Sequence, residues 1–204
     1  MILYRTFGQK FLRPILCTLY KIEVTGSERI PAHGPAVLAA NHDSVLDGFV
    51  MGVLTGRVIH WMAKAELWGY PFVGRIMEAL GAFRVERGAS DELAMAHGID
   101  WLKRGELVGI FPQGTCLPYR ERPFRRGAAR LALAAGAPIV PIALINTEQA
   151  IRPGKVKLGF PKVLAVIGAP LQPEGTVEDL TARLEEAVEN LRKPYGPPQH
   201  AWFD

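Results

Sequence analysis

The chain has 204 residues, of which 49% are hydrophobic and 22% are charged, a composition that fits one globular domain and excludes a disordered chain. Its net charge of +4 favours an anionic partner, such as a lipid headgroup, a phosphorylated substrate or nucleic acid. No apolar run reaches the roughly 18 residues of a membrane-spanning helix. The two cysteines, Cys17 and Cys116, form no CxxC pair, and no cleavable signal peptide is visible, so a reducing cytoplasm is expected.

The first 20 residues combine apolar side chains at roughly helical spacing with interleaved basic ones, and Pro14 should kink this helix or start a second one. The apolar positions are Ile2, Leu3, Phe7, Phe11, Leu12, Ile15, Leu16 and Leu19. Two interpretations are open at this point. The segment is either a core helix packed on the domain or a helix in a membrane interface, with its basic residues on anionic lipid.

From Tyr20 onward, expected strands and helices alternate. Strands are predicted at 22–25, 36–40, 58–62, 83–85, 107–111 and 139–145, and a hairpin of 156–160 with 163–168 around Pro161. Helices are predicted at 46–54, 71–80, 92–103, 127–135 and 177–192, the last beginning after Thr176. This order predicts one α/β domain over residues 21–193, with a largely parallel central sheet flanked by helices, followed by an irregular tail at 194–204.

Polar residues follow the buried strand at 36–40: Asn41, His42, Asp43 and Ser44, and then Asp47. If the chain turns and enters a helix near Leu46, Asp47 can fold back toward the imidazole of His42. A carboxylate there fixes one tautomer and leaves the other ring nitrogen as a general base. The alternative is a turn in which Asp47 caps the helix and His42 lies on the surface.

Two other strand ends carry candidate ligands. The strand at 107–111 is followed by Gln113, Gly114 and Thr115, where Gly114 permits a tight turn whose N–H groups can bind an anion. The strand at 83–85 leads to Arg87, whose guanidinium suits a phosphate. An ordinary loop and a surface ion pair are the corresponding alternatives.

Taken together, these segments resemble the glycerolipid acyltransferase family. Its NH-x₄-D block is matched by Asn41, His42 and Asp47, and its G-x₄-D/E-R block by Gly81, Glu86 and Arg87. The family's F-P-E-G-T-R block corresponds to residues 111–116, and its V-P-hydrophobic block to residues 140–142. Each block alone is a weak signal, but four in the family's order are specific.

The resemblance implies an enzyme of phospholipid biosynthesis in which His42, oriented by Asp47, removes a proton from an acceptor hydroxyl that then attacks an acyl thioester. The donor is acyl-CoA or acyl carrier protein, and the acceptor is a lysophospholipid resembling lysophosphatidic acid. No metal, cofactor or covalent acyl-enzyme is implied, and nucleic acid is not an expected partner. The family pattern places these residues around the substrates: Asn41, Lys64, Arg87, Gln113, Gly114 and Thr115.

The same resemblance favours a peripheral protein on the cytoplasmic face of the cell membrane, with residues 1–20 as an amphipathic interface helix on an anionic surface. Two departures from the pattern bear on the acceptor. Gln113 replaces the family's Glu, and Cys116 replaces its Arg, although four arginines follow within residues 120–126. A different lysophospholipid, a glycolipid or a non-glycerol hydroxyl is therefore a second candidate acceptor.

Four other functions were weighed. Cys116 could form an acyl-enzyme, but no partner that would lower its pKa is evident. A metal site from His33, His42, Asp43 and Asp47 has no distinctive spacing, and the basic run at 120–126 lacks the aromatic residues that stack on nucleic acid. A lipid-binding family member without turnover is the strongest rival, against which the intact His42 and Asp47 argue.

Overall fold

The computed structural model describes residues 13–44, 46–64, 68–69, 81–85, 91–114, 122–152, 155–156 and 162–196. Most of the predicted N-terminal helix, the predicted helix at 71–80 and the end of the predicted tail lie outside these residues. Helix α1 (Arg13–Leu19) is the part of the N-terminal segment that is described. No helix in the described ranges has the length and apolar character needed to cross a membrane.

The core of the fold is a mixed sheet of seven described strands, in the order β1-β9-β6-β2-β5-β3-β4. All neighbouring strands are parallel except β6 and β9, which are antiparallel. The predicted single α/β domain with a largely parallel sheet is therefore confirmed. The strands are β1 (Glu23–Thr25), β2 (Ala36–Ala40), β3 (Ile59–Lys64), β4 (Ala82–Val85), β5 (Leu107–Ile110), β6 (Ile139–Ile145) and β9 (Leu164–Ile167).

Four described helices lie within one or two residues of their predicted bounds: α2 (Asp47–Val53), α4 (Asp91–Lys103), α5 (Gly127–Ala135) and α7 (Val177–Arg192). The short helix α6 (Thr147–Ala150) was not predicted. Two 3₁₀ turns, Ser27–Arg29 and Lys193–Tyr195, are also present, so the predicted irregular tail begins within a turn of helix.

Helix α7 illustrates how local sequence sets an element boundary. The Thr176 hydroxyl accepts a hydrogen bond from the backbone N–H of Asp179, and the Asp179 carboxylate accepts one from the backbone N–H of Thr176. These reciprocal bonds satisfy donors that the first turn of a helix leaves free. The Thr176 hydroxyl also donates to Asp179 Oδ2 at 2.6 Å, and this bond, together with that from the Thr176 backbone N–H, lowers the pKa of Asp179 because both favour its ionised form.

The predicted hairpin at 156–168 is wrong. Strand β9 pairs with β6 on one side and with β1 on the other, which leaves it no edge for residues 156–160. Lys155–Val156 forms β8 and pairs instead with Ile151–Arg152, which forms β7. Nearness in sequence does not determine the pairing here, because every residue of β9 is apolar, which suits a position within the main sheet.

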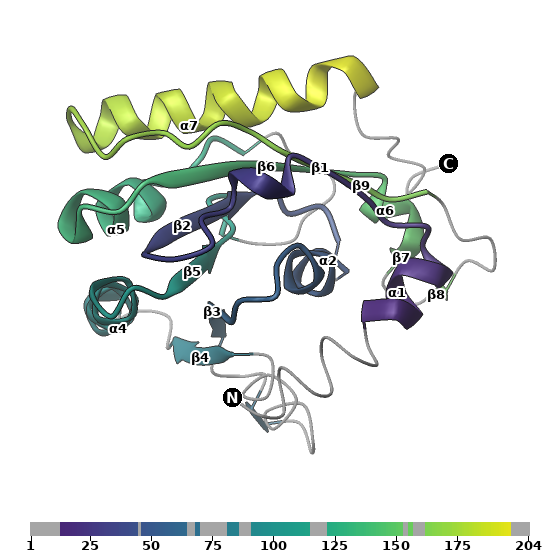
Figure 1. Cartoon of the computed structure of the whole chain (residues 1–204), viewed down its shortest axis with the longest axis horizontal. Coiled ribbons are helices and arrows are strands. Elements are labelled where there is room, and N and C mark those ends of the chain that lie inside the picture. Colours follow the sequence, from purple (N-terminus) through teal and green to yellow (C-terminus); the bar gives the residue numbers. More distant parts are fainter. Residues whose placement is uncertain are drawn as a thin grey trace.

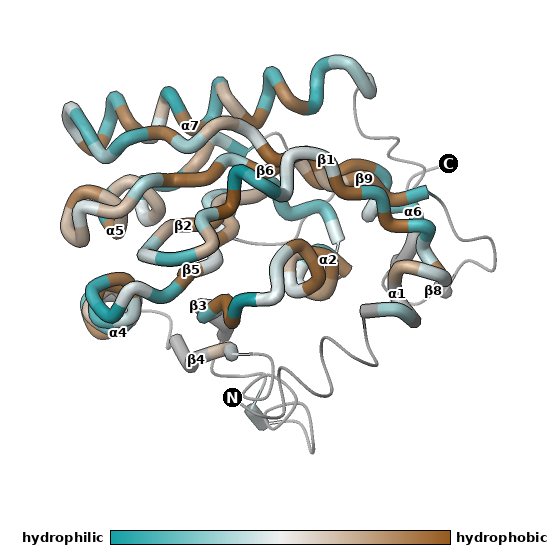
Figure 2. The backbone as a smooth tube through the Cα atoms, in the orientation of Figure 1, coloured by the Kyte–Doolittle hydropathy of each residue, from teal (hydrophilic) through white to brown (hydrophobic). Residues whose placement is uncertain are grey.

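The sheet separates two apolar clusters, as expected when successive strand side chains point to opposite faces. Leu38 of β2 packs in the cluster that contains Met51 of α2, whereas Val37 and Ala39 pack in the cluster formed with α4, α5 and α7. Figure 1 shows α7 along one side of the sheet and α2 on the other. In Figure 2, hydrophilic and hydrophobic turns alternate along α7, which has one face on the core and one in solvent.

This arrangement makes the chain diverge after two neighbouring central strands, at a topological switch point that we call the crevice. The chain leaves β2 for α2 on one face of the sheet and leaves β5 for α5 on the other, although β2 and β5 are paired neighbours. In open α/β sheets, ligands bind where adjacent strands diverge in this way, at the carboxyl ends of the strands. The residues after Ala40 and Ile110 are therefore the first place to look for a site.

Asn41 ties the carboxyl end of β2 to β6. Its Nδ2 donates to the Leu144 carbonyl oxygen at 2.8 Å, and its Oδ1 accepts from the Leu144 N–H at 2.8 Å. Nδ2 also donates to Asp43 Oδ2 at 2.7 Å. The side chain is wholly buried, so it extends the backbone pairing of the two strands where the ladder itself ends.

Asn41→Asp should destabilise the fold, because the substitution replaces a buried donor with an acceptor and puts a second carboxylate against that of Asp43. Loss of the buried bonds should lower the free energy of unfolding by about 1–3 kcal/mol, measured by urea denaturation at pH 7. The matched control is Asn190→Asp on the exposed face of α7, which should leave stability almost unchanged. Equal stability of the two variants would contradict the role assigned to Asn41.

His60 is a buried histidine away from the crevice. It lies on β3, is 6% exposed, and stacks on Trp101 of α4 with ring centroids 3.6 Å apart. Burial lowers its pKa from 6.5 to about 4, although a hydrogen bond with the backbone of Gly81 opposes this shift. The folded protein therefore holds a neutral imidazole at pH values where the unfolded chain is protonated.

This difference predicts acid sensitivity. Because the unfolded state binds the additional proton, protonation of His60 should lower the free energy of unfolding as the pH falls from about 6.5 to about 4. Below about pH 4 the contribution of His60 should not change further. The free energy of unfolding should fall by about 2–3 kcal/mol over this range from His60 alone. His60→Phe keeps an aromatic ring on Trp101 and should flatten this part of the stability curve. The exposed His33, changed to Gln, is the control and should leave the curve unchanged.

Candidate active site

The crevice brings together the segments that follow β2 and β5. His42 comes directly after Asn41, and its backbone N–H donates to Gln113 Oε1 at 2.6 Å. Gln113 belongs to the turn after β5, in which the Gly114 N–H donates to the Phe111 carbonyl oxygen at 2.9 Å. Residues 71 positions apart in the chain thus meet at the carboxyl edge of the sheet.

His42 and Asp47 form the pair that their spacing predicted. His42 Nδ1 lies 2.9 Å from Asp47 Oδ2, and the Asp47 side chain is fully buried while that of His42 is 19% exposed. Because a carboxylate only accepts hydrogen bonds, Nδ1 carries the proton of the neutral ring. Nε2, on the other side of the ring, is then the basic atom.

The position of Asp47 follows from the start of α2. Its Oδ2 also accepts from the backbone N–H groups of Asp43 at 2.7 Å and Ser44 at 2.8 Å. Both N–H donors precede α2, so Asp47 does not cap the helix as the alternative interpretation had it, and the His42 side chain, at 19% exposed, does not lie on the surface. Asp47 holds the turn before α2, and the same oxygen orients His42. The other oxygen, Oδ1, is buried and has no hydrogen-bond partner among the described residues.

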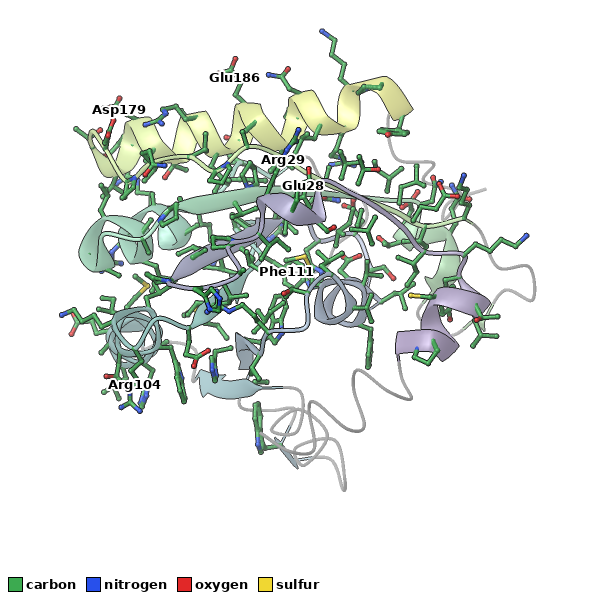
Figure 3. All side chains as sticks on the ribbon, in the orientation of Figure 1. Glu28, Arg29, Arg104, Phe111, Asp179 and Glu186 are labelled. Carbon is green, nitrogen blue, oxygen red and sulfur yellow. The ribbon has the colours of Figure 1, made fainter. Side chains whose placement is uncertain are left out.

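Aromatic rings fix the plane of the imidazole. Phe111 stacks on His42 with centroids 4.1 Å apart and an interplanar angle of 13°, and Trp61 lies against Phe111 at 5.5 Å. In Figure 3, Phe111 lies near the centre of the view, away from α7, whereas Asp179 and Glu186 point outward from α7. A Cβ on Gly109 would lie 2.4 Å from the Trp61 ring. Gly109 is therefore needed for Trp61 to lie over β5.

The structure describes some of the other predicted site residues and not the rest. Lys64 ends β3 and pairs with Val85 of β4, so its backbone lies at the same edge of the sheet, but its side chain is outside the described set. Gly114 has a φ of 75°, as its predicted turn requires, and the Arg125 guanidinium lies against it, 3.1 Å from where a Cβ would be. Arg87 and Thr115 lie outside the described residues, as does Cys116.

Sequence reasoning missed three contacts. It did not predict that Phe111 stacks on His42, that Gln113 holds the His42 amide, or that Asn41 binds Leu144. For the stacking on His42, the available signal was Phe111 itself, an aromatic residue at the end of a buried strand. The other two depend on which strands become neighbours, which motif spacing does not specify. Within the described ranges, no three His, Cys, Asp or Glu side chains are grouped to hold a metal ion.

Comparison with known proteins adds independent findings. The family model named Acyltransferase matches residues 21–145. A 1-acyl-sn-glycerol-3-phosphate acyltransferase of Bacillus subtilis is 34% identical over 169 residues, covering 81% of each chain. An enzyme of the same name from Borreliella burgdorferi is 32% identical over 132 residues, which are 63% of this chain and 53% of that one.

A solved structure shares the fold. The crystal structure of the 1-acyl-sn-glycerophosphate (LPA) acyltransferase from Thermotoga maritima aligns with a TM-score of 0.81 at 26% identity, covering 95% of this chain and 80% of that one. The matched family segment runs from before β1 to the end of β6, and so includes every described residue of the crevice named above. With the His42–Asp47 pair in this crevice, the chain belongs to the Acyltransferase family.

Proposed function

We propose that this protein transfers a fatty acyl group from a thioester donor, acyl-CoA or acyl carrier protein, to the free hydroxyl of lysophosphatidic acid or a close relative. The observation that supports this most directly is the 2.9 Å contact between His42 Nδ1 and the buried Asp47 carboxylate in the crevice. The names of the relatives from Bacillus subtilis and Borreliella burgdorferi support the choice of acceptor.

In the proposed mechanism, His42 Nε2 removes the proton of the acceptor hydroxyl as its oxygen attacks the thioester carbonyl. A tetrahedral oxyanion forms, and its collapse breaks the C–S bond. The imidazolium then returns the proton to the departing sulfur, so that the products are an ester and a free thiol. Asp47 remains ionised and stabilises the imidazolium between the two proton transfers.

The oxyanion needs hydrogen-bond donors close to the reacting carbon. Backbone N–H groups of the turn at 111–114 and the ammonium group of Lys64 are the candidates, because both segments end strands at the crevice edge. For the phosphate of the acceptor, Arg87 is the candidate from the family pattern. Arg125 is a second candidate, because its guanidinium already lies against Gly114 beside the site.

The contact made by Gln113 refines the expectation for acceptor specificity. Its Oε1 accepts the His42 amide hydrogen bond, a task that a Glu carboxylate performs equally well. The amide nitrogen is then the group through which Gln differs from Glu, since it donates where a carboxylate accepts. An acceptor with an additional hydroxyl near this nitrogen is the second candidate substrate, and binding of lipid without turnover is the rival function.

We also propose peripheral attachment to the cytoplasmic face of the membrane through the first 20 residues. The sequence places basic residues among apolar ones there, a pattern that favours the interface of an anionic bilayer. A diacylated product is apolar, so attachment would keep the crevice near both its acceptor and its product.

His42→Ala should remove the general base and therefore reduce kcat roughly 10²–10⁴-fold. Release of free thiol from acyl-CoA, with lysophosphatidic acid as acceptor, measures the rate. Asp47→Asn should also reduce kcat, because an amide cannot stabilise the imidazolium. The matched control is His33→Ala, at an exposed position, which should keep the wild-type rate.

Turnover by folded His42→Ala protein at the wild-type rate would refute the mechanism. Absence of thiol release by the wild type with every lysophospholipid tested, and with either donor, would instead favour the lipid-binding rival. Parallel assays with acyl-CoA and acyl carrier protein identify the donor.

Deletion of residues 1–18 should weaken flotation with vesicles that contain anionic phospholipid. Full-length protein should bind these vesicles more strongly than neutral ones, and less strongly as salt is added, since salt screens the basic side chains. Equal flotation of the truncated and full-length proteins would show that the N-terminal segment is not the anchor.

A further inference from the structure

An ion pair connects the end of the chain's last long helix to the candidate active site. Arg192, the final residue of α7, places Nη2 3.3 Å from Asp43 Oδ2, although the two residues are 149 positions apart. Their side chains are 17% and 8% exposed, respectively. This pair is largely shielded from solvent, unlike the ion pair that Glu178 of α7 makes with Arg126, whose side chains are 66% exposed for Arg126 and 59% exposed for Glu178.

Asp43 is the residue after His42 and belongs to two hydrogen-bond systems. Its Oδ2 accepts from Asn41 Nδ2 at 2.7 Å, so the residues on both sides of His42 are bonded to each other across it. Its backbone N–H donates to Asp47 Oδ2 at 2.7 Å, the same oxygen that contacts His42 Nδ1. Any displacement of Asp43 therefore changes the support of both His42 and Asp47.

We propose that Arg192 is a positioning residue for His42, which acts through Asp43. This inference rests on the proposed function, because it assigns Arg192 a part in presenting His42 as a base. Arg192 contacts neither Asp47 nor the His42 ring in the described structure. Its effect is to neutralise and hold the carboxylate of Asp43, and so to fix the backbone that carries the imidazole.

The packing of α7 explains how Arg192 reaches this place. Leu184 and Val188 are buried on the sheet, and the Leu191 methyl lies only 3.0 Å from where a Cβ on Gly168 would be. Gly168, just after β9, donates its N–H to the Pro141 carbonyl of β6 at 2.8 Å. The last turn of α7 thus lies close to the sheet at a glycine, and a cation in this turn also suits the negative end of the helix dipole.

The electrostatics indicate what loss of Arg192 would do. A carboxylate that is almost completely shielded from water is unfavourable without a compensating charge, and removing one partner of such a pair leaves the other uncompensated. Asp43 would be drawn toward solvent, away from Asn41, and its N–H would move relative to Asp47. Misplacement of a catalytic group by about 1 Å can reduce the rate of reaction by roughly 10²-fold.

The test is kinetic and uses the full chain. Arg192→Met should reduce kcat by about 10- to 100-fold while the KM for each substrate changes little, because substrate contacts are unaffected. Arg192→Lys keeps the positive charge and should retain more activity than Arg192→Met. The matched control, Arg183→Met, removes an exposed arginine from the same helix and should keep the wild-type kcat.

A second substitution separates positioning from general stability. Asp43→Asn removes the buried charge while keeping an oxygen that can accept from Asn41. Added to Arg192→Met, it should restore part of the lost kcat, so that the two changes are not additive. Wild-type kcat in folded Arg192→Met protein, additive losses in the double variant, or a change in KM alone would overturn the proposal.

A readout that does not depend on turnover keeps this inference distinct from the proposed function. Nitrogen NMR of His42 should show the proton on Nδ1 in the wild type and in Arg183→Met, and a mixture of tautomers in Arg192→Met. If the wild type lacks acyltransferase activity but the tautomers change as stated, the proposed function fails and the positioning role stands. An unchanged His42 spectrum in Arg192→Met would overturn the positioning role.

Discussion

A single buried oxygen atom, Asp47 Oδ2, organises the candidate site. It accepts hydrogen bonds from the backbone N–H groups of Asp43 and Ser44 and from His42 Nδ1. The first two bonds close the turn between β2 and α2, and the third sets the orientation of the imidazole. Because one atom serves both purposes, the turn cannot form in its observed shape without also placing His42 against a carboxylate.

The surrounding sheet keeps this turn in place from three directions. Asn41 bonds to β6, Gln113 accepts from the His42 amide, and Phe111 covers one face of the ring. Backbone and side-chain bonds therefore hold His42 on both sides, and its plane is set by stacking. Such prior ordering favours catalysis, since little reorganisation is needed when the substrates bind.

Much of this organisation was predictable from the sequence, for physical reasons. Helical and strand periodicities located α5, α7, β2 and β6, because burial imposes those periods on apolar residues. The spacing of His42 and Asp47 suggested their contact, since a turn followed by a helix brings residues at that separation together. These inferences used only short stretches of chain.

What could not be predicted depends on pairing between distant segments. The hairpin at 156–168 was wrong because β9 had two better neighbours in the sheet, β1 and β6. Likewise, Gln113 was expected to face substrate, but whether its oxygen reaches the His42 amide depends on β2 and β5 lying side by side. A single sequence indicates which segments are buried strands more readily than it indicates their order.

The strand order has a consequence for synthesis of the chain on the ribosome. β2 is flanked by β5 and β6, whose paired residues lie 71 and 102 positions later in the chain than those of β2 (Ala36 with Leu107, and Val37 with Ile139). The strand AVLAA is wholly buried in the finished fold, yet both of its hydrogen-bonding edges lack partners until β5 has been made, and one of them still lacks its partner until β6 has been made. During that interval it is an apolar segment open to unwanted pairing. The segment that is open to unwanted pairing during synthesis is therefore the same one that leads into His42.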